Sequence, residues 1–280
     1  RKTLKEALDQ FKENFNARKN NKLNDVGLKT KYSFFDFATN GLKPADYVLI
    51  AGESGFGKSL VLNNMAIQTW MQDNTIDSTT FSEGKNIVYF SLEMPYEDCF
   101  NRLISRLSEV PSRKIENAKL DKEEMIRVKK ALDFIKNYPY QFEIVDIADA
   151  SAKDIDRILD DVSYDVHSVF IDYLGIMKTS SPTKEEQDWQ KQGIISYEIR
   201  GIARKRKIPI FSAVQLNRKA PSKDPAENIG LNRLARSATI ATHATHVLQI
   251  ESRMNEERQV DMILHIIKNR KGPKIKGKFI

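Results

Sequence analysis

The sequence predicts an α/β fold in which a mostly parallel sheet is flanked by helices. From about residue 30 onward, short β-branched runs alternate with helical stretches, as is typical of parallel strands joined by crossover helices. A glycine-rich motif also joins one apolar run to a helical stretch, which indicates a phosphate loop. Ligands of such sheets bind at the carboxyl ends of the strands, so functional residues are expected directly after each apolar run.

Each predicted element is justified by its periodicity. The predicted strands are short apolar runs at residues 47–51, 86–91, 142–145, 168–171, 208–213, 245–250 and 261–268. The predicted helices are longer and cover residues 59–71, 96–109, 122–137, 153–162 and 185–207. Ser151 precedes the fourth of these helices and Asp154 follows three residues later, which is close to a capping box.

The most specific motif is G-x4-G-K-S/T at residues 52–59, placed between a strand and a helix. Its glycines allow successive backbone N–H groups to surround phosphate oxygens, and the helix N-terminus adds partial positive charge. Lys58 would reach the β- and γ-phosphates, and the Ser59 hydroxyl would ligate Mg²⁺. The motif predicts a nucleoside triphosphate site formed by Gly52, Glu53, Ser54, Gly55, Phe56, Gly57, Lys58, Ser59 and Leu60.

Polar residues end three other predicted strands. Glu93 could orient and deprotonate the water that attacks the γ-phosphate, or it could be an ordinary exposed glutamate before a proline turn. Asp172 closes a fully apolar strand and would hold Mg²⁺ directly or through water. Gln215 could hydrogen-bond the γ-phosphate or the attacking water, or simply be a polar strand end.

Two cations follow the last predicted strand. Lys268 and Arg270 lie two residues apart, so on a strand both side chains would point to one side. Such a pair suits a triphosphate, and a solvated basic hairpin is the alternative.

Composition sets broader limits. Lys and Arg number 45 against 38 Asp and Glu, and this mild net charge of +7 is compatible with a polyanionic partner. The single cysteine, Cys99, excludes an intrachain disulfide and suits a reducing cytosol. It lies in an apolar helical stretch, so its side chain is expected to have a packing role. The four histidines lack zinc-site spacing. With no 18-residue apolar run and no signal peptide, neither a membrane segment nor secretion is expected.

The first 19 residues predict an amphipathic helix. Its apolar residues follow a 3-4 spacing at Leu4, Ala7, Leu8, Phe11 and Phe15. The polar stretch 19–25 then predicts a linker, so residues 1–27 are expected to form a linker helix and linker ahead of a main domain at 28–280. Because the sequence starts at Arg1 and stops inside a strand-like segment, a longer protein with an additional N-terminal domain is expected.

Together these motifs resemble those of the DnaB-type replicative DNA helicases, particularly the bacteriophage members, whose motor is a RecA-like domain. The resemblance runs from about Leu28 to the end of the chain. Its ordered motifs are 52–59, Phe90-Ser-Leu-Glu-Met-Pro95, Ile171-Asp-Tyr-Leu174, Ile208-Pro-Ile with Gln215-Leu-Asn-Arg218, and Ile266-Ile-Lys-Asn-Arg-Lys-Gly-Pro273. Many ATPases share the phosphate loop, whereas its combination with Ser-Leu-Glu-Met and Lys-x-Arg-x-Gly-Pro is far more specific.

The resemblance implies a role for each strand-end residue. Glu93 matches the catalytic glutamate of the family, Asp172 its metal-site aspartate and Gln215 its phosphate sensor. Lys268 and Arg270 match the basic pair that is inserted into the nucleotide site of the adjacent subunit. A residue that acts in a neighbour implies a ring. The family forms hexamers that use ATP and Mg²⁺, with the N-terminal helix packed on the next subunit.

The resemblance also indicates two stretches that face single-stranded DNA, residues 178–193 and 218–240. Their cations are Lys184, Lys191, Arg218, Lys219, Lys223, Arg233 and Arg236, which would bind phosphates without sequence preference. The alternative is a pair of solvent loops whose charges only improve solubility. One departure is that the family often has Arg-Glu-Ser-Gly-Ser-Ile where this chain has Ala235-Arg-Ser-Ala-Thr-Ile240, which changes the local backbone requirements.

The expected function is an ATP-dependent replicative DNA helicase motor that translocates 5′ to 3′ on single-stranded DNA as a hexameric ring. Primase and a helicase loader are expected partners through regions partly absent here, and the cytoplasm, of a bacterial host if the chain is phage-encoded, is the expected location. Two alternatives are a RecA-type recombination or repair ATPase and a nucleotide-gated DNA-binding clamp or loader. Glu93 and Gln215 argue against the clamp, because a clamp does not need machinery for processive hydrolysis.

Overall fold

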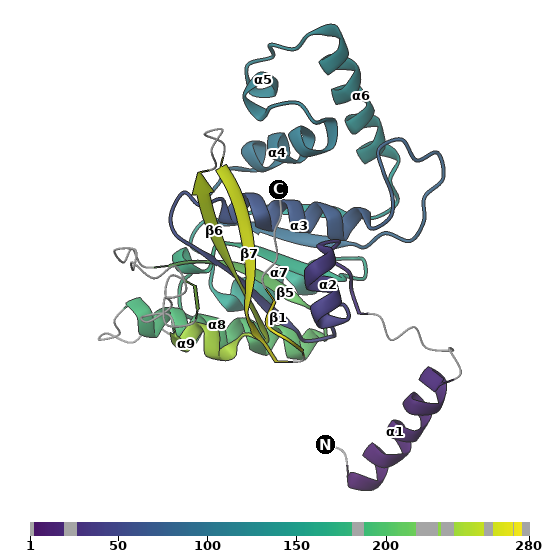
Figure 1. Ribbon diagram of the computed structural model, residues 1–280, viewed down its shortest axis with the longest axis vertical. Coiled ribbons are helices and arrows are strands. Elements are labelled where there is room, and N and C mark those ends of the chain that lie inside the picture. Colours follow the sequence, from purple (N-terminus) through teal and green to yellow (C-terminus); the bar gives the residue numbers. More distant parts are fainter. Residues whose placement is uncertain are drawn as a thin grey trace.

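The computed structural model describes residues 3–19, 27–180, 188–216, 229–230, 238–254, 260–270 and 272–275. Within these residues a seven-stranded sheet has the order β3-β2-β4-β5-β1-β6-β7 (Figure 1). β1 to β6 run parallel to their neighbours, and only β7 is antiparallel, against β6. The predicted α/β fold with a mostly parallel sheet is therefore confirmed.

The strands are β1 (Tyr47–Gly52), β2 (Ile87–Ser91), β3 (Phe142–Asp146), β4 (Ser168–Asp172), β5 (Ile210–Gln215), β6 (His246–Met254) and β7 (Val260–Asn269). The helices are α1 (Leu4–Lys19), α2 (Ser33–Thr39), α3 (Lys58–Met71), α4 (Tyr96–Ser108), α5 (Ser112–Glu116), α6 (Lys122–Asn137), α7 (Ala152–Asp161), α8 (Asp188–Arg206) and α9 (Ala238–His243), with a 3-10 turn, η1 (Leu174–Ile176). Sequence reasoning missed α2, α5 and α9. All three are too short to display a helical repeat, and α2 is rich in Phe, which is a weak helix former.

Helices cover both faces of the sheet. Side chains of α2, α3, α4 and α6 form one core layer, and those of α7, α8 and α9 form the other. β1 contributes alternately to the two, with Tyr47, Leu49 and Ala51 on the α8 side and Val48 and Ile50 on the α3 side. Because both of its faces are buried, β1 is apolar along its whole length, as central parallel strands are.

Local sequence signals are also found where they were predicted. Ser151 and Asp154 form a reciprocal capping box at the start of α7, in which the Asp154 amide donates to Ser151 Oγ at 3.3 Å. Cys99 is buried in α4 with its Sγ 3.1 Å from Ser91 Oγ, in agreement with a packing role. None of the described helices is long and apolar enough to cross a bilayer.

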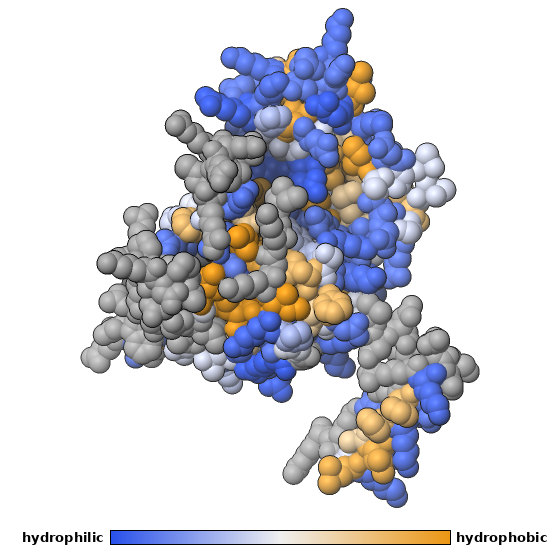
Figure 2. All heavy atoms as spheres, viewed as in Figure 1, coloured by the Kyte–Doolittle hydropathy of each residue, from blue (hydrophilic) through white to orange (hydrophobic). Residues whose placement is uncertain are grey.

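α1 keeps its apolar stripe on the surface. Leu4 is 91% exposed, and Leu8, Phe11 and Phe15 are each at least half exposed. In Figure 1 the helix lies apart from the sheet, and Figure 2 shows apolar side chains along one of its sides. The main body begins at Gly27 and Leu28, whose amides donate to the carbonyl groups of residues 40 and 42.

An aromatic cluster attaches the projecting helix α6 to the sheet. Trp70 of α3 makes edge-to-face contacts with Phe134, Tyr138 and Phe142, and its Nε1 donates to the Tyr140 carbonyl at 2.9 Å. These side chains connect α3, α6 and β3. Trp70 therefore supports both the phosphate-loop helix and the helical layer above it.

Replacing Trp70 by Ala is expected to lower the free energy of unfolding by about 3–5 kcal/mol, because it leaves a large cavity and an unpaired carbonyl. Urea unfolding followed by circular dichroism measures this change. Phe37 of α2 is 81% exposed, so Phe37→Ala is a matched control that should alter stability by less than about 0.5 kcal/mol. Equal effects of the two substitutions would contradict this account of the core.

Candidate nucleotide-binding site

The phosphate loop joins the carboxyl end of β1 to the first residue of α3, Lys58. Gly55 and Gly57 have φ values of 82° and 77°, which glycine adopts without steric cost. A Cβ on Gly57 would also lie 3.1 Å from the Met262 side chain of β7. The loop therefore has little room for side chains at Gly57, and the backbone amides at the start of α3 stay accessible to an anion.

The two key side chains of the loop each have a partner within the site. Ser59 Oγ donates to Asp172 Oδ1 at 3.0 Å, and Tyr89 donates from its hydroxyl to Asp172 Oδ2 at 3.1 Å. Lys58 Nζ donates to the Glu53 carbonyl at 2.8 Å. The sequence-predicted pair of Ser59 and Asp172 is thus brought into direct contact, although 113 residues separate the two in the chain.

Burial dominates the electrostatics of this group. It raises the pKa of the Asp172 carboxyl group, and the hydrogen bonds from Ser59 and Tyr89 oppose that rise. Burial also lowers the pKa of Lys58, against the attraction of Asp172 and Glu93. A cation placed beside Asp172 would stabilise its ionised form, because it offsets the lost hydration.

Ser59 and Asp172 fit a magnesium site. A hydroxyl and a carboxylate oxygen 3.0 Å apart are hard ligands of the kind that Mg²⁺ prefers. In the described parts of the chain no group of three or more His, Cys, Asp and Glu residues could hold a metal ion. Few protein ligands are expected here, because Mg²⁺ at phosphate sites is usually completed by water and phosphate oxygens.

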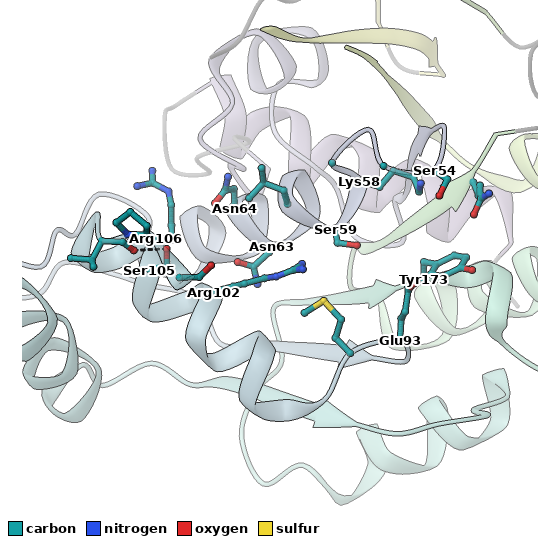
Figure 3. Close-up of a pocket in the computed structure, with 18 of the residues that line it drawn as sticks. Ser54, Lys58, Ser59, Asn63, Asn64, Glu93, Arg102, Ser105, Arg106 and Tyr173 are labelled. Carbon is teal, nitrogen blue, oxygen red and sulfur yellow. Dashed lines mark hydrogen bonds between the residues drawn. The ribbon is translucent and has the colours of Figure 1, made fainter. Parts of the chain in front are cut away.

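A cleft of about 890 Å³ opens in front of the loop. Glu93 and Gln215 both line it, as the sequence predicted. Gln215 is the last residue of β5 and is paired in register with Gly52, so the sheet itself holds it beside the loop. Figure 3 shows Glu93 across the cleft from Lys58 and Ser59.

Some lining residues were missed by sequence reasoning. Arg102 and Arg106 of α4 line the cleft together with Asn63 and Asn64 of α3. Arg102 is half-buried and Figure 3 shows it beside Asn63. A usable signal existed: two arginines four residues apart lie on one face of the helix that follows the Glu93 turn.

Lys268 and Arg270 lie toward the opposite edge of the sheet, meaning the edge at which the parallel strands begin. Lys268 is paired with Val247 of β6, which is itself paired with Leu49, the third residue of β1. The Arg270 amide donates to the carbonyl of Thr245, whose own amide donates to the carbonyl of Tyr47, the first residue of β1. The phosphate loop follows the other end of β1, beyond Gly52. Because β7 is antiparallel, its last residues come back to the edge where the parallel strands begin, away from the nucleotide cleft of the same chain.

The two cations meet on one side of the chain, as their spacing of two residues predicted. β7 ends at Asn269, and the Arg270 amide still donates to the carbonyl of Thr245, just before β6. Lys268 Nζ donates to the carbonyls of Ala241 and Thr242 at 2.5 and 3.1 Å, and Arg270 Nη2 donates to Thr242 at 2.6 Å. Both side chains therefore converge on the end of α9.

Most of the predicted DNA-contacting cations lie outside the described residues, namely Lys184, Arg218, Lys219, Lys223, Arg233 and Arg236. Lys191 is described and exposed, but it belongs to α8 rather than to a loop. The second predicted stretch, 218–240, also ends in a helix, because α9 begins at Ala238. Parts of both stretches are therefore helical, and their contact with DNA stays a prediction.

Two solved structures have a similar fold. The first, described as an ATPase domain, has a TM-score of 0.80 at 20% identity, and the match covers 99% of this chain and 94% of that one. The second, a DnaB-like replicative helicase described together with its interactions with primase, has a TM-score of 0.77 at 21% identity, and the match covers 99% of this chain and 64% of that one.

Sequence relatives point the same way. The replicative DNA helicase DnaB of Helicobacter pylori is 27% identical over 230 residues, which are 80% of this chain and 43% of that protein. The corresponding DnaB of Mycoplasma pneumoniae is 28% identical over 270 residues, which are 90% of this chain and 54% of that protein. The chain thus spans about half the length of these relatives. The family model for the DnaB-like helicase C terminal domain matches residues 27–279, and the chain belongs to this family.

Proposed function

We propose that this chain is the motor of an ATP-driven replicative DNA helicase that works as a hexameric ring and moves 5′ to 3′ along single-stranded DNA. One observation carries the proposal. The residues that we propose to bind a triphosphate lie together at one edge of the sheet, and a convergent cation pair lies at the opposite edge. Membership of the DnaB-like family favours this function over the recombination ATPase and the clamp.

Each cleft residue that the sequence predicted has a proposed part in ATP hydrolysis. The amides at residues 52–60 and the Lys58 ammonium group bind the phosphates. Ser59 and Asp172 hold Mg²⁺, which would neutralise charge on the phosphate oxygens. Glu93 takes the proton of the attacking water, and Gln215 senses the γ-phosphate from the end of β5.

The position of the cation pair supports the proposed ring. Lys268 and Arg270 lie at the edge away from their own cleft, so the triphosphate that they contact belongs to the adjacent subunit. Such head-to-tail contacts close into a ring when the rotation between subunits permits it. The exposed apolar stripe of α1 is proposed to pack on the next subunit, which removes it from water.

DNA contact is proposed for the two stretches 178–193 and 218–240, whose cations would hold the phosphates of a single strand. Primase and a helicase loader are proposed partners, and the place of action is proposed to be the cytoplasm. The primase proposal is supported by the similar fold of the helicase whose interactions with primase have been described.

Replacing Glu93 by Gln is expected to leave ATP binding nearly intact and to reduce DNA-stimulated hydrolysis by about 10²–10⁴-fold, because the amide cannot accept the proton of the attacking water. Equilibrium binding of a fluorescent ATP analogue and steady-state phosphate release measure the two effects. Glu97→Gln, at an exposed glutamate in the first turn of α4, is the matched control. Hydrolysis by Glu93→Gln at the wild-type rate would refute the catalytic assignment.

Mixing two inactive variants tests the shared site. Lys58→Ala and Arg270→Ala are each expected to lose hydrolysis. In mixed rings about a quarter of the interfaces would combine an intact Lys58 from one subunit with an intact Arg270 from its neighbour, so activity should partly return. Phosphate release is measured after subunit exchange, with native mass spectrometry to verify mixed rings.

The control for this experiment mixes Lys58→Ala with the double variant that carries both substitutions, and no activity should return, because no interface is then complete. Mixed rings of the two single variants that stay inactive would show that the pair does not act between subunits.

A further inference from the structure

Three cations converge on one end of α9. Lys268 and Arg270 donate to the carbonyl groups of Ala241 and Thr242. A third cation, Arg200 of α8, donates from Nη1 to the next carbonyl, that of His243, at 2.6 Å. The last carbonyl groups of a helix carry partial negative charge and lack partners within the helix, so cations are favoured there.

α8 holds α9 through residues on one of its faces. A Cβ added to Gly193 would lie 2.9 Å from Thr239 Cγ2, so the two helices approach closely at that point. One turn later Ser196 Oγ donates to the Ile240 carbonyl at 2.9 Å, and after a further turn comes the contact of Arg200. Arg200 therefore contacts the carboxyl end of α9, where the acceptors of Lys268 and Arg270 lie. The Tyr197 ring of α8 packs edge-on against His243 at the same end.

The charges around Lys268 are nearly all positive. Burial, together with the nearby Arg270 and Arg200, lowers the pKa of Lys268 to about 8. The pKa of His243 is lowered by burial and then by the same three cations. Burial, Arg270 and Arg204 lower the pKa of Arg200, and among the described residues the Asp46 carboxylate opposes that lowering. A cluster of this composition is suited to an anion from outside the subunit.

We propose that Arg200 is a positioning residue for Lys268 and Arg270: it fixes the end of α9, whose carbonyl groups hold both side chains together for the triphosphate of the adjacent subunit. This inference rests on the proposed function. Arg200 does not itself contact the phosphates in this proposal. It acts through the backbone of α9 and through its charge.

The contact between Arg200 and α9 lies close to a stretch that is proposed to contact DNA. Residues 238–240 belong both to α9 and to the second stretch that is proposed to contact DNA. If Lys268 and Arg270 turn toward a neighbouring triphosphate, the carbonyl groups at the end of α9 lose the hydrogen bonds that these two side chains donate. In this proposal Arg200 would keep its hydrogen bond to His243, so that α9 would stay attached to α8 during that exchange.

The first test measures the pKa of the Lys268 amine in the intact chain, from the pH dependence of its acylation followed by mass spectrometry. Removing the charge in Arg200→Gln should raise this pKa above the wild-type value of about 8, whereas Arg200→Lys should preserve it. Arg204→Gln is the matched control, because Arg204 is an exposed cation one turn further along α8. Arg200→Met replaces Arg200→Gln if circular dichroism shows that the latter is unfolded.

The second test measures DNA-stimulated ATP hydrolysis. Arg200→Gln should lower kcat at least about tenfold with little change in KM for ATP, because the phosphate loop is intact in every subunit. Arg200→Lys should recover most of the rate. Ser196→Ala removes the neighbouring hydrogen bond between α8 and α9 without changing charge. It therefore separates a general loosening of α9 from the effect of Arg200 on the carboxyl end of that helix.

The outcomes distinguish this inference from the proposed function. If Lys268→Ala and Arg270→Ala hydrolyse ATP normally, the contact between subunits is wrong and the proposed function fails with it. If those two variants are inactive while Arg200→Gln matches Arg204→Gln in both the Lys268 pKa and kcat, the positioning role of Arg200 is overturned and the proposed function stands.

Discussion

The pairing of β1 with β5 on one side and β6 on the other is the constraint on which the rest of the molecule depends. Its parallel register with β5 brings Gln215 level with Gly52, at the start of the phosphate loop. Its register with β6, followed by the antiparallel return of β7, puts Lys268 near the opposite end of β1. A single buried strand therefore determines the separation between the proposed triphosphate site and the cation pair.

The two edges use the same kind of interaction. Lys58 donates to the Glu53 carbonyl at the phosphate loop, and Lys268 donates to the Ala241 carbonyl at the end of α9. Neutral carbonyl groups are weaker acceptors than charged phosphate oxygens, so a triphosphate can compete for both ammonium groups. Burial lowers the pKa of both lysines, because it disfavours the charged form. A nearby anion would therefore stabilise the charged form of each lysine. The structure thus suits a site that is completed by a highly charged ligand.

The largest errors of sequence reasoning fell on short or irregular segments. α9 has only six residues, three of them β-branched, and no amphipathic repeat can be recognised over that length. Its helical form is stabilised by tertiary contacts, the hydrogen bonds from Ser196 and Arg200 among them. Lys191 lies where the helical periodicity over 185–207 predicted a helix, which α8 confirms.

What the sequence determined by itself is what depends on local pattern: the strands and long helices, the phosphate loop, and the polar residue at each strand end. These follow from side-chain periodicity and from the backbone freedom of glycine, which neighbouring residues control. Only the tertiary structure decided which strand ends meet. In the folded chain Ser59 contacts Asp172, and Arg102 lines the cleft. Lys268 and Arg270 lie at the opposite edge of the sheet, close to Arg200. These outcomes depend on strand order and on the reversal of β7, and contacts between residues far apart in the chain set both.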